Sequence, residues 1–484
     1  MSQSVDAGTR PFNAGDGGFL DRFFHLSEHR TTVRTEILAG ITTFMVMAYI
    51  IAVNPAILGR EGPEGWAPGL PVREVATVTC LVAGVMTLAM GLYANRAIAI
   101  APGLGLNAAV AFSLAGSMGL TFPQAMGVIV TEGLIITALV LLGIRQAVMD
   151  AVPLALKKGI AVGIGFFILF IGLVNAGMIR FVPGPTGTTG SILELAPLDT
   201  WPIFVTVVGL ALTIVLYARG IRAAILIGIV ASTIVAFIVP GDVASWPDDP
   251  WSGPSFDLVG EFSFGFWGEL GFLSALLAVF SLMLSDFFDT MGTLVGIGSQ
   301  AGYLNERGEF PDVNKPLLVD SLAAVAGGAV SASSATSYIE SAAGVEVGGR
   351  TGLVSVVTGL LFLLALPFVS LVQAIPQAAT APALIFVGFL MVGIISEAQN
   401  TGEDKTGPRG INFTDLEEGL PVTLTMLFMP LTYSITNGIG VGFISYVLIK
   451  LARGKAREVH PAVYAVAAAF LLYFGRWALF DAKF

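Results

Sequence analysis

Long apolar stretches separated by short polar ones run along most of the chain. Stretches of about 20 apolar residues are long enough to cross a bilayer as helices, and no stretch alternates strictly as the strands of a membrane β-barrel do. The pattern predicts a first set of helices at 36–58, 74–93, 97–117, 123–143, 159–180, 201–218 and 222–240. After a polar, acidic loop at 241–270, it predicts a second set at 271–297, 316–332, 334–350, 351–374, 381–398, 419–435 and 436–452.

Seven helices in each half give an odd number, so the second half enters the membrane from the opposite side. This is the arrangement of an inverted-topology repeat. The distribution of basic residues supports a membrane topology in which the N-terminus is cytoplasmic. Of the 24 Lys and Arg residues, only Arg60, Arg73 and Arg180 fall in the predicted outside segments, as the positive-inside rule requires.

The sequence thus divides into a cytoplasmic tail at 1–34, a first repeat at 35–240, an extracellular loop at 241–270, a second repeat at 271–460 and a C-terminal segment at 461–484. The tail is polar and Gly-rich, without the features of a cleaved signal, and we expect it to be disordered. The C-terminal segment is apolar but carries Arg476. It is either a fifteenth span or an interfacial helix, and we favour the interfacial position.

Composition agrees with a multi-pass membrane protein. The chain is 55% hydrophobic and 12% charged, with a mean hydropathy of +0.82, whereas soluble domains carry about 25% charged residues. The net charge of −10 gives no reason to expect nucleic-acid binding. The single cysteine, Cys80, excludes an intrachain disulfide and a cysteine-based metal site. We expect no metal and no cofactor.

Acidic side chains inside the apolar stretches are the most informative positions. A carboxylate in hydrocarbon costs a few kcal/mol or more, so it persists where it faces a cavity, a partner or a substrate. Asp286 and Asp289 lie three residues apart in the eighth predicted helix and Glu340 lies in the tenth. Asp286 either shares the site with Asp289 or only contacts neighbouring helices. Glu132 in the fourth helix is interpreted as structural.

Two of the predicted helices carry residues that interrupt a helix. The third contains Pro102, Gly103 and Gly105, followed by Asn107, and the tenth has the same character around Glu340 and Ser341. Such breaks turn backbone groups toward a ligand at mid-membrane depth. The matching position in each half is the strongest internal sign of the repeat.

Two further pairs of polar residues are weaker indications of function. Thr42 and Thr43 lie in the middle of the first helix, where their hydroxyls either serve the site or bond back to their own helix. Glu346 and Arg350 lie four residues apart and predict a local ion pair.

These segments resemble the AzgA-like purine permeases of the nucleobase:cation symporter family. The matching stretches are TEILAGITTFMVMAYIIAVNPAIL (35–58), GLYANRAIAIAPGLGLNAAVAF (91–112), GIGFFILFIGLVNAGMI (163–179), FFDTMGTLVG (287–296), SYIESAAGVEVGGRTGL (337–353) and PLTYSITNGIGVGF (430–443). They span nearly the whole chain in the family's order. The additional acid Asp286 and the threonine-poor run SSATSYIES (333–341) depart from the plainest form of the pattern.

The resemblance implies an all-α polytopic membrane protein with 14 transmembrane helices in two inverted seven-helix repeats. Helices 1–4 and 8–11 would form a core domain and helices 5–7 and 12–14 a gate domain, with short extended segments of the interrupted third and tenth helices pairing near the midplane. It implies import of purine nucleobases (hypoxanthine, guanine, adenine) by proton symport across the cell inner membrane, by a homodimer.

The site residues follow from matching the motifs to this chain. Substrate would lie between the interrupted helices and the eighth helix, with Asp289 and Glu340 as its acidic residues and the backbone of 101–105 completing the pocket. We therefore predict a set of substrate-binding residues, namely Asp289, Glu340, Ser341, Asn107, Gly103 and Thr43. Asp289, Glu340 and Asp286 are the candidates for proton coupling.

Other functions fit the residues less well. An anion transporter of the same architecture, for sulfate or bicarbonate, is the alternative, but two acids at its centre disfavour it. An intramembrane aspartyl protease needs a GxGD sequence, whereas Gly103 and Gly105 are followed by Leu106 and Asn107. A cation channel would show filter repeats or rings of charge. The residues alone leave open the preferred purine and the choice between proton and sodium coupling.

Overall fold

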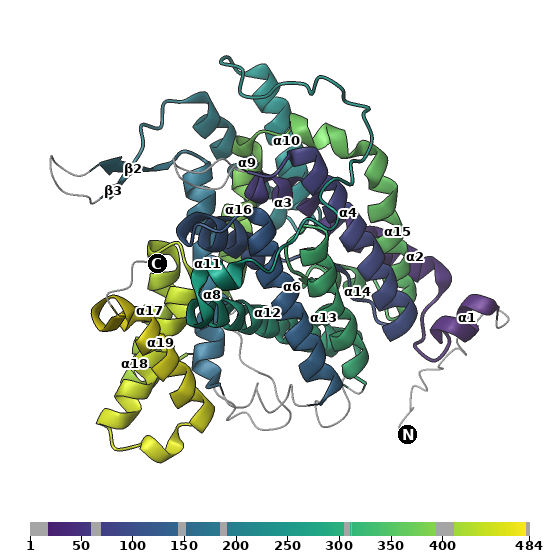
Figure 1. Ribbon diagram of the computed structural model, residues 1–484. Helices are drawn as coiled ribbons and strands as arrows, with labels where there is room; N and C mark the ends of the chain where they lie inside the picture. Colours follow the sequence, from purple (N-terminus) through teal and green to yellow (C-terminus); the bar gives the residue numbers. More distant parts are fainter. Residues whose placement is uncertain are drawn as a thin grey trace, which may run out of the picture.

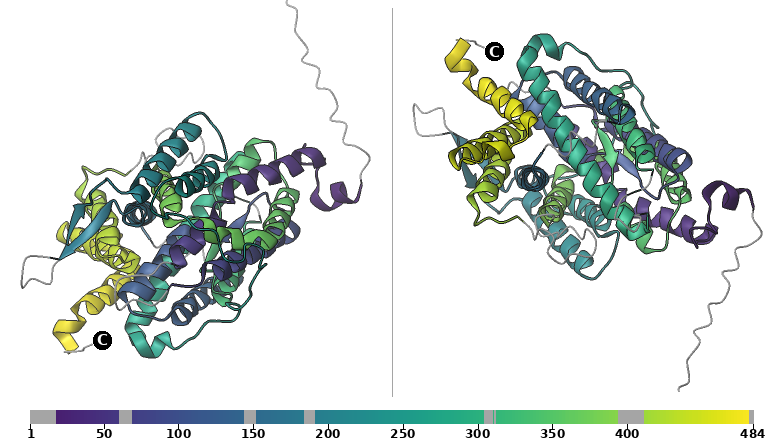
Figure 2. Two further views of the ribbon diagram at one scale, coloured as in Figure 1. Left: turned by 90° about the horizontal axis from the view of Figure 1, so that it is seen from above. Right: turned by 90° about the horizontal axis from the view of Figure 1, so that it is seen from below.

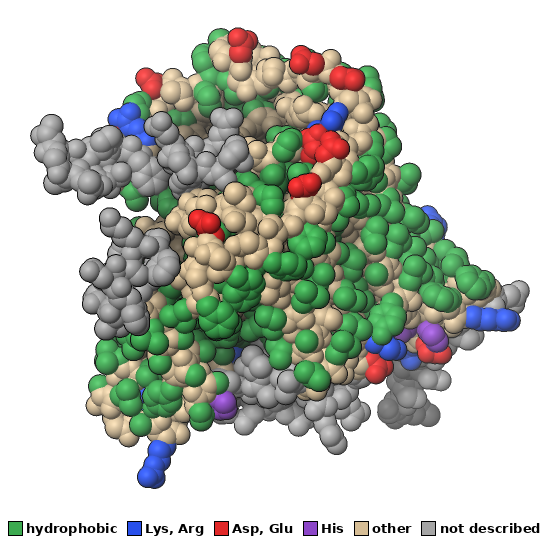
Figure 3. All heavy atoms as spheres, viewed as in Figure 1, with side chains coloured by type: hydrophobic (Ala, Val, Ile, Leu, Met, Phe, Trp, Pro, Cys, Tyr) green, Lys and Arg blue, Asp and Glu red, His purple; other side chains and the backbone are tan. Residues whose placement is uncertain are grey.

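The computed structural model describes residues 18–59, 69–143, 152–183, 191–303, 310, 312–393 and 411–480. The fold is mostly helical, and within these ranges eight helices are long and apolar enough to cross a membrane. In the space-filling view, hydrophobic side chains cover the middle of the visible face (Figure 3). Acidic side chains gather at its upper end, and most of the basic and histidine side chains lie toward the lower end. The chain therefore folds as a multi-pass membrane protein.

The first half contains a series of helices interrupted by short strands (Figure 1). Its elements are α1 (Phe19–Phe24), α2 (Val33–Met47), α3 (Ile50–Leu58), α4 (Val72–Ala89) with its continuation η1 (Met90–Ala94), β1 (Ile100–Pro102), α5 (Leu104–Ala108), η2 (Ala109–Ser117), α6 (Phe122–Leu141), α8 (Leu154–Asn175), β2 (Ile179–Pro183), β3 (Ser191–Leu195), α9 (Trp201–Ala218) and α10 (Ala224–Ile238).

The second half has a similar order of helices and strands. These are α11 (Phe266–Leu270), α12 (Phe272–Ala301), α13 (Asn314–Ala329), β4 (Ala335–Ser337), α14 (Ser341–Glu346), α15 (Gly352–Ala365) with its continuation η3 (Leu366–Ala374), α16 (Gln377–Val392), α17 (Leu416–Leu431), α18 (Ile435–Ala452), η5 (Ala456–Glu458) and α19 (Pro461–Phe480). Most predicted helices agree with these bounds within a few residues.

The predicted helices at 97–117 and 334–350 both need correction at their starts. Residues 100–102 and 335–337 form strands, and the helices that follow begin only at Leu104 and Ser341. Strands β1 and β4 pair antiparallel, with Ala101 opposite Thr336. The extended segments expected in the interrupted helices therefore exist and pair with each other.

Helices pack in two groups. Helices α2, α4, α6, α13, α14 and α15 contact one another around β1 and β4, whereas α8, α9, α10, α16, α17 and α18 form a second group of mutual contacts. Helix α12 contacts members of both groups. In the view from below it runs across the molecule, with α17–α19 at one side (Figure 2).

Close helix contacts explain several glycines. A Cβ at Gly133 of α6 would lie 2.7 Å from the backbone nitrogen of Val325 in α13, and a Cβ at Gly328 would lie 2.9 Å from that of Val130. Since real Cβ atoms do not approach a backbone this closely, the two helices can touch only with glycine at these positions.

The tail and the region at the end of α8 also depart from the sequence prediction. Residues 19–24 of the tail form α1, with Phe24 and Leu26 buried against Leu353. The hairpin β2–β3 was not predicted, and it follows α8, which ends at Asn175 instead of 180. Part of the predicted tail (1–17) and of the predicted helix at 381–398 lies outside the described residues.

The C-terminal segment forms α19, which packs against α18 and α12. Its buried face includes Val463, Ala467 and Phe470, and the ring of Phe470 fills the space that a side chain at Gly440 would need. This face attaches α19 to the helix bundle. Its interfacial position remains a prediction.

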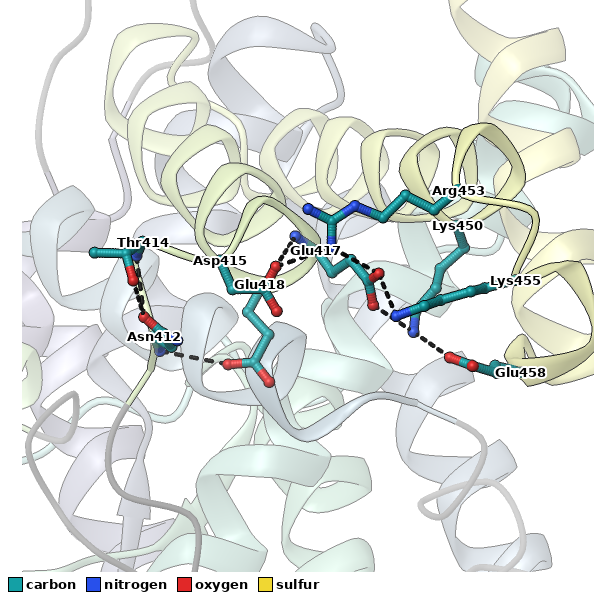
Figure 4. Close-up of polar contacts among 9 residues, drawn as sticks. All are labelled: Asn412, Thr414, Asp415, Glu417, Glu418, Lys450, Arg453, Lys455 and Glu458. Carbon is teal, nitrogen blue, oxygen red and sulfur yellow. Dashed lines mark hydrogen bonds and ion pairs between the residues drawn. The ribbon is translucent and has the colours of Figure 1, made fainter.

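Charged residues fasten α17 to the end of α18 and to η5 (Figure 4). The carboxylate of Glu417, in the first turn of α17 and before its apolar part, accepts hydrogen bonds from Lys450 at 2.8 Å, Arg453 at 2.8 Å and Lys455 at 2.6 Å. Lys450 also contacts Glu458 at 2.7 Å. The hydrogen bonds from Lys450, Lys455 and Arg453 lower the pKa of Glu417 to about 2.

Candidate functional site

The paired strands form the centre of the candidate site, and glycine allows their close approach. A Cβ at Gly103 would lie 2.9 Å from Cγ2 of Thr336. The Gly103 N–H donates to the Ser334 carbonyl at 2.8 Å, and the Tyr338 N–H donates to the Ala99 carbonyl at 2.9 Å. The Tyr338 hydroxyl closes the arrangement by donating to the Pro102 carbonyl at 2.5 Å. These bonds satisfy backbone groups that a broken helix would leave unpaired in the membrane.

Glu340 and Asp289 come together beside this strand pair. Glu340 directly precedes α14, Asp289 lies on α12, and both are partly exposed. They lie close enough to interact electrostatically with each other and with the hydroxyl of Tyr49, whose side chain is fully buried. The Tyr49 hydroxyl donates a hydrogen bond to Oε1 of Glu340 at 2.6 Å. Two carboxyl groups from distant parts of the chain thus lie close to each other beside the strand pair.

Asp286 differs from Asp289 in its surroundings. Asp286 is 1% exposed, whereas Asp289, three residues further along α12, is partly exposed. The burial of Asp286 agrees with the interpretation in which it lies among neighbouring helices.

Other predicted residues lie close to the strand pair but differ in what their polar atoms contact. The Ser341 hydroxyl accepts from the Ala99 N–H at 2.9 Å and donates to the Tyr338 carbonyl at 2.7 Å, so it holds the two interruptions together. Asn107 on α5 is buried, and neither atom of its amide has a hydrogen-bond partner within the described residues. That amide remains available to a ligand.

The two threonines of α2 have different roles. The Thr42 hydroxyl donates to the Leu38 carbonyl of its own helix at 2.8 Å. The Thr43 hydroxyl is buried and has no partner in the described part of the chain, and a Cβ at Gly344 of α14 would lie 2.2 Å from it. Thr43 therefore faces the helix that follows Glu340.

The predicted ion pair between Glu346 and Arg350 is wrong. Arg350 Nη1 donates instead to the carbonyls of Val345 and Gly349, both at 2.6 Å, whereas Glu346 approaches Arg222 at 3.5 Å. The guanidinium group satisfies carbonyls at the end of α14, which spacing in the sequence does not reveal.

A buried carboxylate that the sequence analysis missed supports the strand pair. Asp320 of α13 is 1% exposed. It accepts hydrogen bonds from the Thr290 hydroxyl at 2.6 Å, from the Ser337 N–H at 2.8 Å and from the Ser337 hydroxyl at 2.7 Å. Asp320 thereby ties β4 to α12 and α13. An acid in the apolar run PLLVDSLAAVAG (316–327) was the available signal.

Tyr49 was also missed, because an aromatic residue in an apolar stretch gives no sign of a polar partner. Phe44 of α2 packs edge-on against Phe362 of α15, with ring centroids 5.1 Å apart. Among the described residues, no group of three or more His, Cys, Asp or Glu is arranged to hold a metal.

Comparison with known proteins gives a family and a fold. The model of the permease family Xan_ur_permease matches residues 34–411. The adenine permease AdeQ of Escherichia coli K12 is 39% identical over 95% of this chain and 97% of its own length. The guanine/hypoxanthine permease PbuO of Bacillus subtilis is 38% identical over 93% of this chain and 99% of its own length.

Solved structures are similar in fold at low sequence identity. The transmembrane domain of the cyanobacterial bicarbonate transporter BicA aligns with a TM-score of 0.58 and 16% identity, over 84% of this chain and 97% of that domain. A structure of SLC26A9 aligns with a TM-score of 0.58 and 11% identity, over 87% of this chain and 66% of that one.

Proposed function

The chain belongs to this permease family and is a transporter rather than an enzyme, and from that premise we propose that it imports purine nucleobases by proton symport. Its relatives are adenine permeases and guanine/hypoxanthine permeases that match nearly its whole length. The observation that carries the proposal is the meeting of Asp289 and Glu340 at the paired strands.

A purine base suits this arrangement chemically. It is flat, and its edge offers neighbouring N–H donors and ring acceptors. A carboxylate can accept two neighbouring N–H groups, and hydrogen bonds to a charged acceptor are the stronger class. Asp289 and Glu340 would accept from the base, while the unpaired amide of Asn107 supplies both a donor and an acceptor. Thr43 and the backbone at Gly103 complete the proposed set, and Ser341 holds the interruptions in place.

Proton coupling follows from the same residues. The substrate is neutral, so a carboxylate that takes up a proton on one side of the membrane and releases it on the other links transport to the proton gradient. Asp289 and Glu340 are close enough for their charges to interact, so they would bind and release protons as a pair. Asp286 would contribute through α12, which it shares with Asp289.

The same proposal includes the finer architecture. Fourteen helices would form two inverted repeats, 35–240 and 271–460, with helices 1–4 and 8–11 as a core that slides against a gate made of helices 5–7 and 12–14. The two groups of packed helices support this division. The N-terminus would be cytoplasmic, the location the cell inner membrane and the assembly a homodimer.

Uptake of labelled hypoxanthine and adenine into proteoliposomes tests the proposal. An inward proton gradient should drive uptake, and unlabelled purines should block it while uracil, sulfate and bicarbonate do not. Asp289→Asn and Glu340→Gln should abolish uptake, whereas Glu346→Gln, a change at an exposed carboxylate, should not. Uptake blocked by sulfate or bicarbonate would favour the anion-transporter alternative. Uptake driven equally well without a proton gradient would overturn the coupling.

A further inference from the structure

A groove lies between α1 and the first turn of α2. Its volume is about 520 Å³, and its apolar lining consists of Phe19, Leu20, Leu26 and Val33. None of the proposed substrate-binding residues lines it, so it is separate from the candidate site. A mostly apolar space of this size with a few polar groups is typical of a ligand-binding site.

The apolar wall of the groove is exposed. Phe19 is 78% exposed, and its ring stacks on that of Phe23, which is 43% exposed, with centroids 5.9 Å apart. Leu20, beside Phe19, is 38% exposed. Helices that lie in the interface of a membrane present such aromatic and aliphatic side chains to the lipid and basic residues to water and headgroups.

This wall continues into the lipid-facing side of α2. Val33, Ile37, Ile41 and Met45 follow one another at intervals of four residues and are 37% to 41% exposed, so they lie along one face of the helix. Helix α2 begins a candidate membrane span at Val33, and Val33 also lines the groove. In the space-filling view, hydrophobic side chains extend onto the part formed by α1, with basic and histidine side chains at its outer end and lower edge (Figure 3).

The charged residues that line the groove are Asp21 and Arg34. Both carboxylate oxygens of Asp21 already accept hydrogen bonds, from the Ser27 N–H at 2.8 Å and from the Ser27 hydroxyl at 2.7 Å. Arg34 is exposed and forms no ion pair within the described residues. Its guanidinium group is therefore the charge in this groove that remains available to a ligand.

We propose that this groove binds a phospholipid with an anionic headgroup from the cytoplasmic leaflet. An acyl chain would lie against Phe19, Leu20 and Val33, while the guanidinium of Arg34 donates charge-assisted hydrogen bonds to the phosphate. Anionic lipids attract basic residues that lie next to a membrane span. A zwitterionic headgroup carries its own cation, which Arg34 would repel. The choice of leaflet follows from the proposed cytoplasmic N-terminus.

The groove is attached to the group of helices around β1 and β4. Leu26 lines the groove and also packs with Phe24 against Leu353 at the start of α15. Asn95 joins the same parts, because its Nδ2 donates to the Phe24 carbonyl at 3.2 Å and its Oδ1 accepts from the Gly352 N–H at 2.8 Å. A lipid that occupies the groove would therefore hold α1 against α15 and stabilise the folded protein.

Thermal unfolding of the purified full-length protein in a neutral detergent, without any purine, tests the site. The melting temperature is followed as dioleoylphosphatidylglycerol, dioleoylphosphatidylcholine or glycerol phosphate is added. A ligand that binds the folded state raises it. The anionic lipid should raise it at lower concentration than the zwitterionic lipid, and glycerol phosphate should not raise it. Equal responses to the two lipids, or a full response to glycerol phosphate, would overturn the proposal. Stabilisation that depends on protein concentration instead of lipid would do the same, because it would show that a second copy of the chain covers the groove.

Variants assign the effect to the groove. Arg34→Gln should raise the concentration of anionic lipid needed for half of the stabilisation about fivefold. Arg22→Gln is the matched control, since it removes the same charge from an exposed residue of α1 that does not line the groove, and it should have little effect. Phe19→Ala should weaken lipid binding without disturbing the fold, because that ring is 78% exposed. Equal effects of Arg34→Gln and Arg22→Gln would show only a general attraction to anionic lipid and would refute the site.

Discussion

Replacing Tyr49 by Phe removes one hydroxyl and leaves the packing intact. The Tyr49 ring is fully buried, and Phe keeps its shape, so no cavity forms. The hydroxyl is the group that holds Glu340, since it donates to Oε1 at 2.6 Å. In the proposed mechanism Glu340 must present its carboxylate to the base, and Tyr49 acts on the substrate through that carboxylate as a positioning residue.

The size of the effect follows from the strength of this hydrogen bond. Hydrogen bonds to charged groups contribute about 1.5–3 kcal/mol. Glu340 is partly exposed, so water replaces part of the lost bond, and the lower end of that range applies. A loss of about 1.4 kcal/mol in binding free energy raises the dissociation constant tenfold. Tyr49→Phe should therefore weaken purine binding about tenfold and change the melting temperature little.

Calorimetric titration of purified protein with hypoxanthine or adenine measures the dissociation constant directly. Tyr93→Phe is the control, because that ring is 56% exposed and its hydroxyl has no place in the proposed site. A dissociation constant of Tyr49→Phe within twofold of wild type, in protein that melts normally, would refute the assignment of Glu340 as a substrate-binding group positioned by Tyr49.

Three further changes test the supporting structure. Asp320→Asn replaces a carboxylate that accepts three short hydrogen bonds. The change should lower the free energy of unfolding by about 1–3 kcal/mol. An unchanged melting temperature would contradict this expectation. Phe470→Ala should lower the free energy of unfolding by about 3–5 kcal/mol, because that ring is 0% exposed and packs against α18. Leu471→Ala is the control and should lower it little, because that side chain is 57% exposed. Equal losses in the two variants would show that α19 is not packed as described. Glu417 has a pKa lowered to about 2, so its contribution to stability is present above its ordinary pKa near 4.5 and disappears as pH falls toward 2. The melting-temperature difference between wild type and Glu417→Gln should therefore be constant above about pH 5 and vanish at the acid end, and a difference that persists at pH 2 would exclude this charge effect.

The order of apolar and polar residues was sufficient to locate most helices. The stretch predicted at 201–218 is α9, Trp201–Ala218, and the stretch predicted at 436–452 is α18, Ile435–Ala452. A helix in a membrane satisfies its own backbone hydrogen bonds, so its position depends on local composition. The breaks at Gly103 and before Ser341 were predictable for the same reason, because glycine and proline act on their own stretch of backbone. The residues of both motifs also carried the resemblance to the permease family.

What the tertiary structure decided involves partners far apart in the chain. The hydroxyl of Tyr49 and the carboxylate of Glu340 are 291 positions apart, and nothing near either residue reveals the other. In the sequence, Asp320 is a single acid in an apolar helix. Its hydrogen-bond partners are brought to it only by the packing of β4. Arg350 had an obvious acidic neighbour four positions away, yet its guanidinium caps the backbone at the end of α14. Local residues determine whether a segment is a helix, but only packing brings together the donors and acceptors of different segments, and the candidate site consists of such long-range pairs.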